Sequence, residues 1–282
     1  METLTVLGTG VLGSQIIFQS AYSGKTVVAY DISDEILAKL PARWEQLGAS
    51  YLKDLPDATQ DKIDAAVSRI RASSDLADAV KDADLVIEAV PERLDIKQDT
   101  WKKVSAVAPE KTVFATNSST LLPSAIAPFT DRPDKFLAMH FANQVWIFNT
   151  CEVMGHAGTD PAVFESAAGF AEQIGMVPIR IHKEQPGYVL NSLLVPFLEA
   201  AAKLYMRDIA SVEDVDKTWR ISTGAPMGPF QIYDIVGMMT PYMLNKDSDD
   251  PEMKAFADKI KSDFIDKGYL GTSTGRGFYT YG

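Results

Sequence analysis

Short apolar segments alternate with longer amphipathic stretches through the first two thirds of this chain. The apolar segments are rich in β-branched and aromatic residues, which favours strands. We interpret these segments as strands: Leu4–Leu7, Val27–Tyr30, Leu85–Ala89, Val113–Thr116, Phe136–His140 and Val177–His182. Helical patterns lie between them, at Leu12–Tyr22, at Leu94–Val107 and from Asp160-Pro161 to Gly175. The alternation predicts an α/β fold with a doubly wound, mostly parallel sheet.

The pattern changes after residue 182. Residues Lys183–Gly187 are polar and end in a proline–glycine pair, which is typical of a hinge. Beyond the hinge we find helical patterns only, and the first, Val189–Met206, is apolar on more than one face. Further helix boundaries are marked by Ser211 with Asp214, by Asp250-Pro251 and by Gly268. We therefore predict an α/β domain at 1–183 and a smaller all-α domain at 184–282.

The net charge indicates which partners are unfavourable, and the cysteine content indicates the redox compartment. The 282 residues carry a formal net charge of -11, and a field of this sign repels nucleic acids and anionic membrane surfaces. We expect neither as a partner, although an anionic small molecule remains compatible. We also expect no secretory signal, and no apolar run that approaches the roughly 20 residues needed to span a bilayer. The only cysteine is Cys151, which favours a soluble protein of the reducing cytoplasm.

The sharpest local pattern is a glycine loop between the first strand and the first helix. It consists of Gly8, Thr9, Gly10, Val11, Leu12 and Gly13. Such a loop makes a tight turn, lets a pyrophosphate approach the backbone and packs the helix closely. Asp31 ends the second strand, where a carboxylate binds the adenosine ribose and repels the extra phosphate of NADP. The pattern predicts a Rossmann-type domain that binds NAD; taken alone, Asp31 also fits a helix cap.

Histidine is the residue that could act as the base in such a dehydrogenase near neutral pH. The chain has three, namely His140, His156 and His182. We favour His140, because it ends a strand at the carboxyl edge of the predicted sheet, where ligands bind. Glu152 lies in an apolar segment and would suit an acid that orients the imidazole. By position alone, His140 also fits a satisfied structural histidine, and Glu152 an edge-strand carboxylate facing water.

Several sequence blocks together resemble the L-3-hydroxyacyl-CoA dehydrogenase family over nearly the full length. Beside the glycine loop, the blocks are Glu88–Glu92 with Lys97, Thr116–Ser119, Met139–Asn143, Gly187–Pro196, Gly224–Phe230 and Thr274–Tyr279. Their order and spacing are more specific than any single block. The resemblance implies NAD-dependent oxidation of an L-3-hydroxyacyl-CoA to the 3-oxoacyl-CoA, or the reverse, as in fatty acid metabolism. Short chains such as 3-hydroxybutyryl are favoured.

The resemblance also implies roles for individual residues. His140 matches the family's catalytic base, and Glu152 matches the acid that orients it. Ser119 and Asn191 match groups that hydrogen-bond the substrate oxygen or seat it near the nicotinamide. The cofactor-lining positions are matched by Glu92, Lys97, Ser119 and Asn143. We assign no metal ligands.

Three departures from the family lie close to the expected substrate and cofactor. Ala142 and Gln144 replace an aromatic residue and a proline after the histidine, and Ser273 replaces a lysine that reaches the cofactor. The segment around Lys53 and Asp54 matches a CoA-touching run only weakly. The dehydrogenase chemistry stands, but a free hydroxy acid stays open as the substrate, as in relatives acting on L-gulonate or carnitine.

Two further alternatives differ in class. One is a non-catalytic recruited relative, of the kind known among lens proteins. The other is the β-hydroxyacid dehydrogenase group, whose lysine base would have to be Lys203 or Lys217.

The helix Val189–Met206 carries more apolar surface than one intramolecular face needs. The resembling family commonly dimerises through its helical domain. We therefore expect a homodimer with a two-fold contact formed mainly by residues beyond Gly187.

Overall fold

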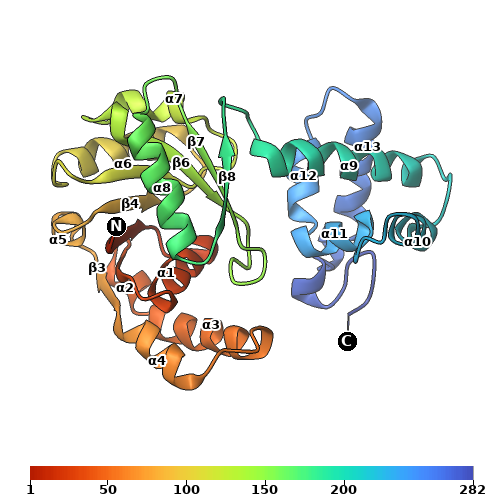
Figure 1. The fold of residues 1–282 in the computed structure, drawn as a ribbon. Coiled ribbons are helices and arrows are strands. Elements are labelled where there is room, and N and C mark those ends of the chain that lie inside the picture. Colours follow the sequence, from red (N-terminus) through yellow and green to blue (C-terminus); the bar gives the residue numbers. More distant parts are fainter. Residues whose placement is uncertain (282) are drawn as a thin grey trace. The chain divides into compact units, whose positions relative to one another are not determined.

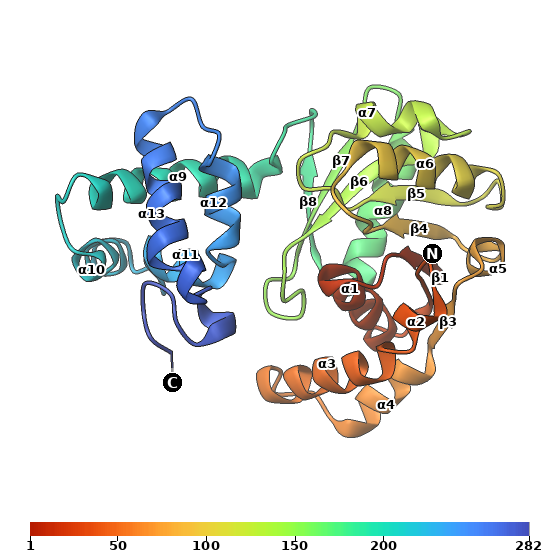
Figure 2. The same cartoon turned by 180° about the vertical axis from the view of Figure 1, so that it is seen from behind.

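The computed structural model describes residues 1–281, which divide into two compact units between Val189 and Leu190. The first unit is a sheet with helices on both faces, and the second is helical (Figures 1 and 2). The predicted α/β domain followed by a smaller all-α domain is thereby confirmed. The division lies a few residues beyond the predicted boundary at residue 183.

The strands of the described chain form one eight-stranded sheet in the order β3-β2-β1-β4-β5-β6-β7-β8. Their bounds are β1 (Thr3–Leu7), β2 (Thr26–Tyr30), β3 (Ile70–Ser73), β4 (Leu85–Glu88), β5 (Val113–Thr116), β6 (Phe136–Phe141), β7 (Thr150–Gly155) and β8 (Val177–Ile181). All neighbouring pairs are parallel except β6 and β7, which are antiparallel. The chain runs outward in opposite directions from β1, so a crevice is expected beyond its carboxyl end.

Helices pack on both faces of this sheet. They are α1 (Val11–Tyr22), α2 (Asp34–Leu37), α3 (Leu40–Asp54), α4 (Gln60–Ser68), α5 (Leu76–Val80), α6 (Leu94–Ser105), α7 (Pro123–Ile126) and α8 (Pro161–Gln173). Successive side chains of a strand point to opposite faces. In β5, Val113 and Ala115 accordingly join the core beneath α1, α3, α4 and α8, whereas Phe114 joins the core beneath α5, α6 and α7.

The second unit contains the remaining helices, the first of which starts in the first unit. They are α9 (Tyr188–Met206), α10 (Val212–Thr223), α11 (Pro229–Val236), α12 (Met239–Asn245) and α13 (Pro251–Asp263). Leu198, Phe230 and Phe256 lie in its core. As predicted, the Ser211 side chain caps α10 by accepting a hydrogen bond from the amide of Asp214.

The differences from the predicted elements have local causes. The strand β3 was not predicted, because Ile70–Ser73 is a short edge segment without an apolar run. The segment of β7 was considered only as an edge strand with Glu152 facing water, because this acid interrupts its apolar residues; β7 instead lies between β6 and β8, and Glu152 is buried. The helix α13 ends at Asp263 rather than at Gly268, which instead caps a separate 3-10 turn.

The expectation that no apolar run approaches the length of a membrane span is wrong. By length and composition alone, α9 is long and apolar enough to cross a bilayer. Its polar residues, such as Glu199 and Lys203, are too widely spaced to break the apolar window. Part of the helix, including Leu198 and Ala202, packs into the core of the second unit.

Candidate active site

The glycine loop connects β1 to α1 as the sequence predicts. Gly8 has φ +98°, and a Cβ there would lie 2.7 Å from the carbonyl oxygen of Ala89. A Cβ on Gly13 would collide with the carbonyl of Gly8, whereas one on Gly10 would enter open space. The loop therefore needs glycine for its turn and its packing, and it leaves free room at the start of α1. This arrangement fits a pyrophosphate at a helix N-terminus.

A cavity of about 690 Å³ opens beside this loop. Its lining comes from the carboxyl ends of β1, β2 and β4 and from the nearby helices, and includes Gly8, Thr9, Gly10, Asp31, Lys39 and Arg43. The carboxylate of Asp31 accepts hydrogen bonds from the Thr9 amide (2.8 Å) and hydroxyl (2.7 Å) and from the Ile32 amide (2.9 Å). These bonds fix the carboxylate at the cavity wall, which fits the predicted ribose contact.

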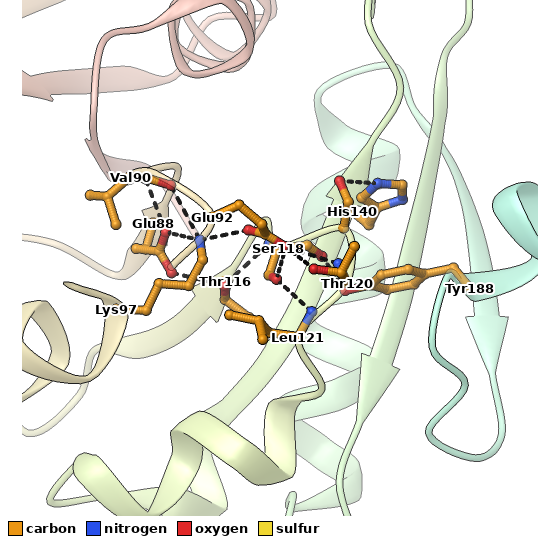
Figure 3. A network of polar contacts seen from close by, with 11 residues as sticks. Glu88, Val90, Glu92, Lys97, Thr116, Ser118, Thr120, Leu121, His140 and Tyr188 are labelled. Atoms are coloured by element: carbon orange, nitrogen blue, oxygen red, sulfur yellow. Dashed lines mark hydrogen bonds and ion pairs between the residues drawn. The ribbon is translucent and has the colours of Figure 1, made fainter. Parts of the chain in front are cut away.

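A buried ion-pair network adjoins the cavity (Figure 3). Lys97 on α6 is 1% exposed, and its ammonium lies 2.6 Å from Glu88 and 3.2 Å from Glu92. Glu88 ends β4 and also accepts hydrogen bonds from Thr116 (2.8 Å) and from the Val90 amide (2.9 Å). A charge buried this deeply needs such partners. The network holds the segment after β4 in one conformation.

Glu92 occupies the open end of this network. Burial alone would raise the pKa of its carboxyl group. The Ser118 hydroxyl, the charge of Lys97 and the Thr120 amide and hydroxyl outweigh that effect, and together they lower the pKa to about 2. Glu92 is therefore an anion and a hydrogen-bond acceptor at every physiological pH.

His140 and Glu152 are cross-strand neighbours in the antiparallel pair β6–β7. Directly opposite residues place their Cβ atoms about 5 Å apart, so the register itself brings the side chains together. Nδ1 of His140 lies 2.9 Å from Oε2 of Glu152, and both side chains are buried. The apolar surroundings strengthen this contact. The predicted pairing of the two side chains is present in the structure.

Ser119 follows β5 and lies on the other side of the imidazole. Its hydroxyl oxygen is 3.1 Å from Nε2 of His140. Tyr188, the first residue of α9, stacks on the face of the same imidazole, with ring centroids 4.4 Å apart. The imidazole is thus contacted at both nitrogens and on one face.

The other predicted residues lie on other segments of the chain. Asn143 is exposed in the loop after β6, and Asn191 lies on α9 in the second unit. His156 contacts the Pro133 carbonyl and the Gly158 amide in a turn, and this accounts for it structurally. Lys203 forms an ion pair with Asp250 on the second unit. Among residues 1–281 there is no group of three or more side chains suited to a metal ion.

Sequence reasoning missed Ser118 and Thr120 as partners of Glu92, and Tyr188 as a partner of His140. The pairing of Glu88 with Lys97 could have been predicted, because an acid at the end of a buried strand needs a cation and Lys97 follows on the next helix. Tyr188 had none, since its left-handed backbone (φ +55°) is unusual for a bulky residue.

Comparisons with known proteins agree with this geometry. The family description "3-hydroxyacyl-CoA dehydrogenase, NAD binding domain" matches residues 3–185, and "3-hydroxyacyl-CoA dehydrogenase, C-terminal domain" matches residues 187–281. The mitochondrial hydroxyacyl-coenzyme A dehydrogenase of Rattus norvegicus is 34% identical, over 100% of this chain and 91% of its own. The 3-hydroxybutyryl-CoA dehydrogenase of Clostridioides difficile is 32% identical, over 99% of both chains.

A solved structure of higher identity is also similar to this chain. A diketoreductase, described as catalysing reactions of dicarbonyl compounds, is 56% identical with a TM-score of 0.96. The match covers 100% of this chain and 99% of that structure.

Proposed function

Because this chain belongs to the 3-hydroxyacyl-CoA dehydrogenase family, with NAD as its cofactor, we propose that it interconverts L-3-hydroxyacyl-CoA and 3-oxoacyl-CoA of short chain length. The observation that carries the proposal is the buried His140–Glu152 pair with Ser119 at the second imidazole nitrogen, Nε2. A base, an acid that orients it and a hydroxyl at one point are what alcohol oxidation requires of the protein.

In the direction of oxidation, Nε2 of neutral His140 takes the proton of the substrate hydroxyl. Bound NAD would supply the acceptor for the hydride on the carbon that bears this hydroxyl, and loss of the proton and the hydride together converts the alcohol into a ketone. Glu152 accepts a hydrogen bond from Nδ1–H, which fixes the tautomer and stabilises the imidazolium that forms. Ser119 lies where its hydroxyl can donate to the substrate oxygen and keep it near Nε2. In the direction of reduction, the imidazolium returns the proton.

Two groups support the cofactor end of this proposal. Glu92 offers an anionic acceptor for ribose hydroxyls, because its pKa of about 2 keeps it ionised. Lys97 is committed to Glu88 and Glu92. We therefore infer that Lys97 orients Glu92 towards the ribose.

A second candidate substrate is a dicarbonyl compound without CoA. A 3-oxoacyl thioester is itself a 1,3-dicarbonyl, so the same proton and hydride transfers apply. Two observations favour this candidate: the 56% identity to the diketoreductase, and the end of α3. There Asp54 accepts a hydrogen bond from the Trp146 indole (2.9 Å). A carboxylate in that segment is a poor partner for the phosphates of CoA.

The test is a substrate panel with NADH. Acetoacetyl-CoA, free acetoacetate and ethyl acetoacetate separate the thioester, the free acid and a CoA-free dicarbonyl. The primary proposal expects acetoacetyl-CoA to give the highest kcat/KM. A higher kcat/KM for the ester would assign the second candidate, and no turnover of any of them would remove both.

The base is tested by His140→Ala, which should lower turnover by roughly 100- to 10,000-fold while NAD still binds. Glu152→Gln should retain the fold and impair the same step, because the imidazolium loses its charged partner. Near-normal turnover of His140→Ala would remove His140 from the mechanism.

We also propose that Asp31 makes the enzyme prefer NAD over NADP, because its carboxylate repels a 2′-phosphate. Lys39 and Arg43 line the same cavity, so Asp31→Ala should improve the kcat/KM with NADP. Equal efficiency of the unaltered protein with both cofactors would contradict the assignment.

A homodimer is proposed from the apolar exposure of α9. Leu193 is 69% exposed, and Val189 and Leu190 are also exposed. Apolar surface of this kind is usual at an interface. Sedimentation at micromolar concentration should give twice the mass of one chain, and an active monomer would contradict this.

A further inference from the structure

Tyr188 contacts the proposed catalytic base and was not foreseen from the sequence. Its side chain is 1% exposed. Its ring lies nearly parallel to the His140 imidazole, with an interplanar angle of 14° and a centroid distance of 4.4 Å. Its hydroxyl donates a hydrogen bond to the Ser118 carbonyl at 2.7 Å. Burial raises the pKa of this hydroxyl, so it remains a donor. Figure 3 shows Tyr188 entering the polar network, with the His140 imidazole drawn above it.

The backbone at Tyr188 has an unusual conformation. Its φ is +55°, and that of Gly187 is +79°. A bulky residue rarely adopts the left-handed region, and such outliers persist only where surrounding contacts enforce them. Here the Tyr188 amide donates to the Gln185 carbonyl (3.0 Å), while the hydroxyl and the ring hold the other end of the residue.

The same short segment also reaches Glu152. The amide of Val189 donates to Oε1 of Glu152 at 2.8 Å, and Oε2 contacts His140. Adjacent residues therefore contact both members of the pair, Tyr188 through its ring and Val189 through its amide. An ordinary backbone turn at Tyr188 would move the ring or the amide out of place.

The single hydrogen bond at Nδ1 limits rotation of the imidazole about its Cβ–Cγ bond from one side only. Such a rotation would move Nε2 away from Ser119. A parallel ring on the face of the imidazole opposes this motion, because the two rings would collide or lose contact. We propose that Tyr188 is a positioning residue that keeps Nε2 of His140 aimed at the substrate oxygen.

The inference rests on the proposed role of His140 and is tested on the whole enzyme. Tyr188→Leu removes the ring and Tyr188→Phe keeps it. The matched control is Tyr51→Leu, since Tyr51 is also fully buried and its hydroxyl is bonded, to Gln19 at 2.5 Å. Steady-state kinetics with NADH and acetoacetyl-CoA (or whichever panel compound is turned over), NAD binding and thermal unfolding are measured for each variant.

For Tyr188→Leu we expect a kcat lowered by roughly 10- to 100-fold, the scale of a small misplacement of a catalytic group, with KM values changed by no more than about 2-fold. Tyr188→Phe should keep kcat within about 3-fold, because the ring does the positioning. Tyr51→Leu should lower the unfolding temperature without a comparable fall in kcat.

Three results would overturn the inference: a normal kcat for Tyr188→Leu, an equal fall for Tyr188→Phe, or an equal fall for Tyr51→Leu. If Tyr188→Leu does not fold, Tyr188→Met replaces it, and a normal kcat for that variant overturns the inference too. Retained turnover of His140→Ala would contradict the proposed function instead. An inactive His140→Ala together with a fully active Tyr188→Leu would contradict only the proposed role of Tyr188.

Discussion

The two units bury carboxylates in different ways. In the first unit, Glu88 and Glu92 share the ammonium of Lys97. In the second unit, Asp216 and Asp234 are buried and accept hydrogen bonds from backbone amides and tyrosine hydroxyls. The pKa of Glu92 is lowered to about 2, whereas burial raises the pKa of Asp234 despite its hydrogen bonds. Two differences separate these carboxyl groups: Glu92 is partly exposed and has the charge of Lys97 beside its neutral donors, whereas Asp234 is buried among neutral donors and the charge of Asp216 raises its pKa further.

The different pKa values of Glu92 and Asp234 match their surroundings. In the first unit, Glu92 and Lys97 adjoin the cavity beside the glycine loop, where an ionised carboxylate can accept hydrogen bonds from a ligand. In the second unit, Asp234 binds the amides of Phe278 and Tyr279 and the hydroxyl of Tyr281. A Cβ at Gly277 would collide with this carboxylate. The block Thr274–Tyr279 is thereby explained as the segment that wraps a buried acid.

The largest effect is expected from Lys97→Met. The change leaves Glu88 buried without its cation, which should cost about 3–5 kcal/mol of unfolding free energy. Urea denaturation measures this. The matched control is Lys103→Met on the same helix, whose ion pair with Asp99 is exposed and should contribute little to stability. Equal losses of unfolding free energy in the two variants would mean that burial does not increase the contribution of the Lys97–Glu88 ion pair to stability.

A smaller loss is expected from Asp234→Asn. The amide retains one acceptor oxygen but turns its NH2 group towards donors, which should cost about 1–3 kcal/mol. Thermal unfolding of this variant is compared with that of Asp266→Asn, whose carboxylate is exposed and paired with Lys261. A stabilised Asp234→Asn would show that the cost of burying the charge exceeds the value of its hydrogen bonds.

Tyr281→Phe should have a still smaller effect. It removes one donor to Asp234 and leaves the two amides in place, a loss of about 0.5–1.5 kcal/mol. The same denaturation experiment on Tyr281→Phe combined with Asp234→Asn should give less than the sum of the two changes. Simple additivity would show that the two groups do not interact.

The smallest effects are on the pH dependence of stability. On acidification, Glu92 in the first unit and Asp234 in the second should change the free energy of unfolding with opposite signs. The lowered pKa of Glu92 contributes stability above its usual value of 4.5 that is lost as the pH falls towards 2. The raised pKa of Asp234 contributes stability that is full below 3.8 and is lost as the pH rises through the folded value. On acidification, Glu92→Gln should therefore lose stability less steeply than the unaltered protein, and Asp234→Asn more steeply. The difference for Glu92 should be small because solvent screens its partly exposed carboxyl group, and urea titrations between pH 2 and 7 would detect a reversed order of the two variants.

The sequence predicted the parts of the fold that depend on local pattern. The apolar strands β1, β2, β4, β5, β6 and β8 and the glycine loop lie where expected. It did not predict β7 as an inner strand, because the central acid hides the pattern of a buried strand. The register of β6 and β7 is what brings His140 and Glu152 together, and register depends on contacts between segments. The position of Tyr188 depends on a backbone conformation that residue type does not encode.

The cross-strand register of His140 and Glu152 has a consequence for how such an enzyme can diversify. Both residues belong to the strands, and the loop 142–149 between them holds neither. Gln15 and Asp54 tie that loop to α1 and α3 through its amides and Trp146. Substitutions in the loop therefore need not displace the His140–Glu152 pair, because the strands hold both side chains. On the function proposed above, a lineage built on this hairpin could change the residues between the two strands step by step while the proposed acid–base pair stays in place.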